Sequence, residues 1–117
     1  MSHTHFDLWD LKVEVIRSGA GKIYSGAQEG DYFELRGEML HLPEGQGFSI
    51  YSLGALVPLL AAKQRQTDPA DWITTDTVIG NPDPNCPTQF RITRTKLRRF
   101  EHAETTKVPM GQKEDDQ

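Results

Sequence analysis

One apolar stretch restricts most strongly what this chain can fold into. It runs from Ser49 to Ala62, and the turn-forming segment Pro43-Glu44-Gly45-Gln46-Gly47-Phe48 leads the chain into it. No other segment of the 117 residues is as long and as apolar, so we expect the core to form around it. Its large apolar residues recur near helical spacing: Ile50, Leu53, Leu56, Val57, Leu59 and Leu60.

The pattern predicts a helix over Ser49 to Arg65. Ser49 is a suitable N-cap, and Lys63-Gln64-Arg65 closes the apolar run. Pro58 removes a backbone donor, so we expect either a kink near Gly54 or two stacked short helices. Burial of the stripe would contribute on the order of 10 kcal/mol of transfer free energy. The residues expected in the core are Ile50, Leu53, Leu56, Val57 and Leu60.

Segments with strand-like composition flank this helix. The clearest lies at 11–16, where Leu11, Val13 and Val15 alternate with charged residues. Further strands are expected at 32–35, 39–42, 75–79 and 89–93. Together these elements predict an α+β fold, in which a small, mainly antiparallel sheet packs against one central Pro-containing helix.

The two ends of the chain are more polar than its middle. We therefore expect an N-terminal extension at 1–10, a single domain at 11–100 and a polar C-terminal tail at 101–117. The tail is rich in acidic residues and has no hydrophobic periodicity, which predicts disorder.

Composition narrows the class of partner and the compartment. The net charge of −4 disfavours nucleic acid and anionic membranes as partners. The single cysteine permits no internal disulfide and no cysteine-based zinc cage. The first residues contain no apolar leader, and the run at 50–62 is too short to cross a bilayer. We expect a cytoplasmic protein and predict no cofactor.

The proline-rich loop at 81–87 is the first candidate for a catalytic site. It holds Asp83 as a candidate acid or base and Cys86 as a candidate nucleophile in a rigid frame. A thiol nucleophile needs a base, for which the candidates are His41 and His102. The alternative is a rigid turn with an incidental cysteine.

A second group of residues is expected to complete that site. We expect the helix start and the Asp71-Trp72 turn to converge on the loop, with Asp71 catalytic and Trp72 binding the ligand. Gln46 would donate a hydrogen bond, and Lys63 or Arg65 would bind an anion. Asp71 also belongs to a run of carboxylates that could bind Mg²⁺, although ordinary helix-start chemistry explains that run equally well.

Histidines near the N-terminus form a weak candidate metal site. His3 and His5 would share one side of an extended segment, with Asp7 nearby. The alternative is a solvated tail, and we assign no metal.

One basic run stands out in this acidic chain. Its cations could bind an acidic protein surface, and less readily phosphate or RNA, while a charge-protected edge strand is the simpler explanation. The run contains Arg91, Arg94, Lys96, Arg98 and Arg99.

An ordered set of motifs over residues 8–96 resembles a family of small prokaryotic proteins of unknown function. The motifs are Pro43-Glu44-Gly45-Gln46-Gly47-Phe48, Lys63-Gln64-Arg65, Asp71-Trp72 and Pro82-Asp83-Pro84-Asn85-Cys86. The resemblance implies a small α+β domain without an assigned activity. It also implies cysteines that this chain lacks, at Ala20 or Lys22, at Ser49 and at Asn81.

These observations favour a small non-catalytic accessory or assembly subunit of a larger cytoplasmic metabolic enzyme complex. The partner would be a larger protein subunit, or further copies of the chain. One alternative is a stand-alone small-molecule or metal-dependent enzyme with its site at loop 81–87. A weaker alternative is a regulator that binds nucleic acid or an anion.

Overall fold

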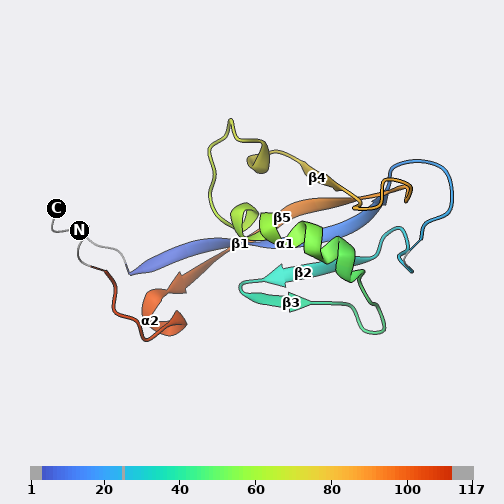
Figure 1. The fold of residues 1–117 in the computed structure, drawn as a ribbon. Coiled ribbons are helices and arrows are strands. Elements are labelled where there is room, and N and C mark those ends of the chain that lie inside the picture. The colour runs from blue at the N-terminus through green and yellow to red at the C-terminus, as the bar shows by residue number, and fades with distance from the viewer. Residues whose placement is uncertain (1–3, 25, 112–117) are drawn as a thin grey trace.

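The protein is a five-stranded antiparallel sheet with one long helix on one face (Figure 1). A computed structural model describes residues 4–24 and 26–111. The strand order is β3-β2-β1-β5-β4, so β1 and β5 lie at the centre. This architecture confirms the predicted α+β class. The elements are β1 (His5–Arg17), β2 (Tyr32–Arg36), β3 (Met39–His41), α1 (Ile50–Gln64), the 3-10 turn η1 (Trp72–Thr74), β4 (Thr77–Gly80), β5 (Thr88–Glu101) and α2 (His102–Thr105).

The pairing of β1 with β5 reaches further than the sequence predicted. It begins where His5 faces Glu101 and ends where Arg17 faces Thr88. Residues 5–10, expected to belong to an extension, are therefore strand. Phe6 and Phe100 stack at 5.3 Å between ring centroids and support the outer end of this ribbon.

An extra residue on β5 shifts the register of this pairing. Leu11 faces Arg94, whereas Asp10 faces Lys96, so Thr95 is the extra residue. Paired residues share a face and successive residues alternate. Arg94 therefore lies on the face that carries Leu11, and Lys96 lies on the opposite face.

The core lies between α1 and the face of the sheet that carries Leu11. Leu56 is fully buried and Leu60 nearly so, in contact with apolar residues of β1, β2 and β5. The prediction that Ile50 and Val57 belong to the core is wrong, since their exposed fractions are 70% and 51%. The buried positions of the helix follow i, i+4, i+8 spacing through Ser52, Leu56 and Leu60, which turns Ile50 and Val57 outward.

The helix is continuous and capped at both ends. Ser49 is the N-cap, as predicted, and its hydroxyl oxygen accepts a hydrogen bond from the amide of Ser52 at 3.4 Å. Pro58 lies inside a single helix, so the alternative of two short helices is wrong. No helix among residues 4–24 and 26–111 is long and apolar enough to cross a membrane.

The beginning of the C-terminal tail is structured. The amide of His102 donates to the carbonyl of Thr4 at 2.7 Å, and the first helical turn after β5 follows directly. Residues 102–105 therefore differ from the predicted disorder, while residues 112–117 lie outside the described part of the chain.

Truncation of Leu56 tests which side of α1 forms the core. Leu56→Ala should lower the free energy of unfolding by about 2–5 kcal/mol, because it leaves a cavity against the sheet. The neighbouring exposed residue provides the control, and Val57→Ala should cost less than about 1 kcal/mol. Urea denaturation measures both values, and equal losses would contradict this orientation of the helix.

Candidate functional site

Two neighbouring clefts flank the first turn of α1. The larger, about 590 Å³, lies against the loop that precedes the helix, and its lining includes Gln46, Phe48 and Phe90. The smaller, about 400 Å³, lies against the proline-rich loop and includes Asp83 and Cys86. Ser49 and Ser52 line both clefts, so the beginning of the helix separates them.

The proline-rich loop and the helix start converge as expected, and the loop is built by its own polar side chains. The Asn81 carboxamide oxygen accepts from the amide of Asp83 at 2.8 Å, and an Asp83 carboxylate oxygen accepts from the amide of Asn85 at 2.9 Å. Asp83 thus shapes the turn as well as lining the smaller cleft. Ser49 and Asn81 line this cleft together with Cys86.

Cys86 is buried, and neither of its two candidate histidine bases is among the residues that line its cleft. Its sulfur lies 3.6 Å from the hydroxyl oxygen of Thr88, which also accepts a hydrogen bond from Asn81 at 2.9 Å. The two candidate bases lie elsewhere. His41 is on the edge strand β3, and His102 is in α2, where its ring nitrogen contacts the carbonyl of Val108 at 2.6 Å.

Gln46 lines the larger cleft but its side chain is committed to the backbone. Its Oε1 accepts from the amide of Tyr32 at 3.2 Å, and its Nε2 donates to the carbonyl of Tyr32 at 2.7 Å. This pair of hydrogen bonds mimics strand pairing and attaches the loop to β2. Its structural role is clear, and its predicted ligand-binding role stays a prediction.

Asp71, Trp72, Lys63 and Arg65 do not join this site. They gather at the opposite end of α1, and none of them lines either cleft. Asp71 caps η1 by accepting from the amide of Ile73 at 2.9 Å. The geometry therefore contradicts the expected convergence of the Asp71-Trp72 turn with the proline-rich loop.

Lys63 is the buried cation at this end of the helix. Its ammonium donates to the carbonyls of Ile73 at 2.8 Å and Thr75 at 2.7 Å, and to the hydroxyl of Thr77 at 3.1 Å. These three acceptors use all its donors. Burial, assisted by the positive charge of Arg94, lowers the pKa of Lys63. The residue thus holds the η1 segment against the helix.

The predicted basic patch is divided between the two faces of the sheet. Arg94 caps the end of α1, donating to the carbonyls of Lys63 and Arg65 at 2.8 Å each. The other three arginines lie close to carboxylates: Arg91 to Asp76 at 3.8 Å, Arg98 to Asp10 at 2.6 Å and Arg99 to Asp7 at 3.4 Å. Lys96 is exposed. Most of the cations that the sequence suggested for binding an external partner therefore interact with carboxylates or carbonyl groups of the chain itself.

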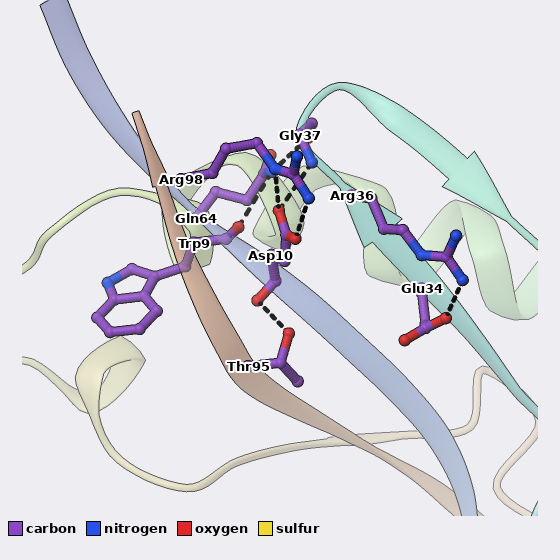
Figure 2. Close-up of polar contacts among 8 residues, drawn as sticks. All are labelled: Trp9, Asp10, Glu34, Arg36, Gly37, Gln64, Thr95 and Arg98. Carbon is purple, nitrogen blue, oxygen red and sulfur yellow. Dashed lines mark hydrogen bonds and ion pairs between the residues drawn. The ribbon is translucent and has the colours of Figure 1, made fainter. Parts of the chain in front are cut away.

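Asp10 forms a buried polar centre that sequence reasoning missed (Figure 2). Its carboxylate accepts two hydrogen bonds from Arg98, at 3.1 and 2.6 Å, and one from the amide of Gly37 at 2.9 Å. Gln64 donates to the carbonyl of Gly37 at 2.7 Å and to that of Trp9 at 3.2 Å. The hydrogen bonds from Arg98 lower the pKa of the Asp10 carboxyl, against the opposing effect of burial.

An apolar ridge follows one side of α1. Ile50 and Val57 lie fourteen and seven residues before Gln64, so all three lie on nearly the same side of the helix. Since Gln64 contacts Gly37, in the turn between β2 and β3, this side faces the β2–β3 hairpin. Leu40 pairs with Leu35, which packs on the core, so Leu40 also lies on the helix-bearing face. We define the apolar ridge as Ile50, Val57, Leu40 and Leu42.

Metal binding receives no support from the described residues. No group of three or more histidine, cysteine, aspartate or glutamate side chains in that part of the chain could hold a metal ion. Of the candidate pair His3 and His5, His3 lies outside the described residues, and His5 begins β1.

Comparisons with protein-family models, with curated proteins and with solved structures find no match to this chain. The resemblance to a family of small prokaryotic proteins therefore stays a prediction.

The acid stability of the protein should report on Asp10. Its pKa is lower in the folded state than in the unfolded chain, so it stabilises the fold above about pH 4. That stabilisation is lost as the pH falls through the folded-state pKa. Asp10→Asn should reduce the fall in melting temperature between pH 6 and pH 3. The control Asp7→Asn, at an exposed ion pair, should retain the wild-type profile, and a wild-type profile for Asp10→Asn would contradict this assignment.

Removal of the Lys63 ammonium tests the attachment of η1. Lys63→Met leaves buried carbonyl groups without their donor and should lower the free energy of unfolding by about 1–3 kcal/mol. Hydrogen exchange should accelerate at residues 73–77 in this variant. The exposed Lys96→Met is the control and should change neither measurement; an unaltered Lys63→Met protein would refute the structural role.

Proposed function

We propose that this chain is a small accessory subunit that binds a larger cytoplasmic protein through the apolar ridge. The observation that carries the proposal is the outward position of Ile50 and Val57 on the one long helix. They are large apolar side chains in a helix whose buried face is already complete through Leu56 and Leu60. Internal packing therefore does not account for them.

The energetics support a role in association. Full burial of a side chain such as Ile50 or Val57 contributes roughly 1.5–3 kcal/mol, and both are more than half exposed in the isolated chain. Leu40 lies on the same face of the neighbouring hairpin, and Leu42 follows it directly after β3; each is 44% exposed. A partner that covers all four would gain the apolar centre that specific interfaces require.

The position of β3 adds a second means of recognition. β3 is the outer strand of the sheet next to the ridge, so one side of its backbone has no neighbouring strand in the described sheet. An extended segment of the partner could pair with β3 while its side chains contact Leu40 and Leu42. A protein can offer both an apolar surface that covers the ridge and an extended segment that pairs with β3. This favours a protein partner over a small molecule at this surface.

The stand-alone enzyme is the second candidate, and the smaller cleft favours it. Asp83 and Cys86, the two candidate catalytic residues of the proline-rich loop, both line that cleft. An activity of this site should be lost in Asp83→Asn or Cys86→Ser and retained in the ridge variants described below.

Paired charge substitutions test the accessory-subunit proposal. The full chain with Ile50→Glu and Val57→Glu should lose a larger protein that co-elutes in fixed stoichiometry with the wild-type chain from cells that make it. Leu97→Glu is the matched control, because Leu97 is 50% exposed but lies on β5 away from the ridge. The control should retain the partner.

Thermal melts must show that the double variant remains folded, which the exposure of both residues predicts. Retention of the same partner by the folded double variant would contradict the proposal. A wild-type chain that elutes alone, or only as copies of itself, at micromolar concentration would also contradict it.

A further inference from the structure

We infer that a small, uncharged, planar ligand binds beside the first turn of α1, where Ser52 lines both clefts. This inference is independent of the accessory-subunit proposal, because no side chain of the apolar ridge lines either cleft.

Ser52 carries the inference. Only 3% of the residue is exposed, yet its hydroxyl makes no hydrogen bond to any residue in the described part of the chain. The hydroxyl oxygen opens to the clefts and is not sealed in the core, because Arg91 Nε is the one fully buried side-chain nitrogen or oxygen without a hydrogen-bond partner among the described residues. Because Ser52 lines both clefts, a molecule in either one could supply the missing partner.

The start of the helix adds donors at the same place. The backbone N–H groups of Ile50 and Tyr51 have no acceptor among the described residues, as expected for the first turn of a helix. With the Ser52 hydroxyl, they offer hydrogen bonds to a carbonyl or amide oxygen of a ligand.

The charges around the clefts favour an uncharged ligand. The charged residues among those that line them are all acidic, namely Asp31, Glu44 and Asp83. These carboxylates oppose an anion. Asp31 and Asp83 already accept backbone hydrogen bonds, and the positive end of the helix dipole opposes a cation.

The smaller cleft sets the shape of the ligand. Tyr24, Tyr51 and Pro82 contribute flat or apolar surfaces to it, and its volume of about 400 Å³ accommodates a one-ring molecule. A planar ring can stack on a tyrosine while its polar edge reaches Ser52. The ligand class is therefore an uncharged aromatic or heterocyclic molecule with an amide or carbonyl edge.

Three probes of nearly equal shape test this class. Benzamide is neutral, benzoate is its anionic counterpart and benzamidine its cationic counterpart. In titrations of the ¹⁵N-labelled full chain, benzamide should shift the amide signals of Tyr51, Ser52 and Cys86 selectively. The two charged probes should bind at least about fivefold more weakly. Benzamide shifts that are absent or scattered over the surface, or equal binding of a charged probe, would overturn the inference.

Ser52→Ala separates a ligand-binding hydroxyl from a structural one. Benzamide should bind about fivefold more weakly to this variant. Its melting temperature should stay the same, since the hydroxyl opens to the clefts and makes no hydrogen bond within the described part of the chain.

Thr77→Val is the control, because the buried Thr77 hydroxyl accepts a hydrogen bond from Lys63 at the other end of α1. This variant should melt at a lower temperature and bind benzamide unchanged. Unchanged benzamide binding by Ser52→Ala, or a fall in its melting temperature like that of Thr77→Val, would overturn the role of Ser52.

Discussion

The antiparallel pairing of β1 with β5 is the constraint on which the rest of the structure depends. It extends from His5 opposite Glu101 to Arg17 opposite Thr88, and β2 and β4 add to its outer sides. Its register determines which residues face α1. A shift of one residue would move Phe90 and Ile92 to the solvent side and remove the surface on which Leu56 and Leu60 pack. The pairing also brings loop 81–87 to the beginning of the helix.

Because Thr95 is an extra residue in β5, two arginines of this strand lie on different faces of the sheet and make different contacts. Arg94 lies on the helix-bearing face and caps the end of α1, whereas Arg98 lies on the other face and holds Asp10. Gln64 connects the two regions by contacting Trp9 and Gly37 (Figure 2). The helix, the β2–β3 hairpin and the central strands are thus fastened together at one end of α1. The clefts and the proline-rich loop lie at the other end.

The sequence predicted the elements that depend on local pattern. The alternation of Leu11, Val13 and Val15, the Ser49 cap and the apolar run indicated the strand, the helix and the α+β class. The strand at residues 5–10 was not predicted, because it forms by pairing with residues 96–101. The local sequence pattern does not reveal such a distant pairing. The outward position of Ile50 and Val57 was missed because the predicted apolar stripe included them, whereas the buried face of the helix runs through Ser52, Leu56 and Leu60.

Candidate site residues were predicted less well, for a related reason. The signal for a basic surface was the density of cations at 91–99, but most of their partners are acids or carbonyls far away in the sequence. Loop 81–87 and the helix start were correctly expected to meet. Asp71 and Trp72 were misplaced because the direction in which the chain leaves α1 is set by Lys63 and Arg94. A buried lysine with three neutral acceptors has no sequence signature.

Amide hydrogen exchange on the isolated full chain tests the central pairing most directly. We predict slow exchange for residues 6–10 and 96–100 at the amides that pair across the β1–β5 ribbon, with protection comparable to that of the inner part of the same pairing. Unprotected amides throughout both segments, with protection confined to residues 11–17 and 88–94, would contradict it. The Asp10–Arg98 centre and the shifted register would then lose their basis.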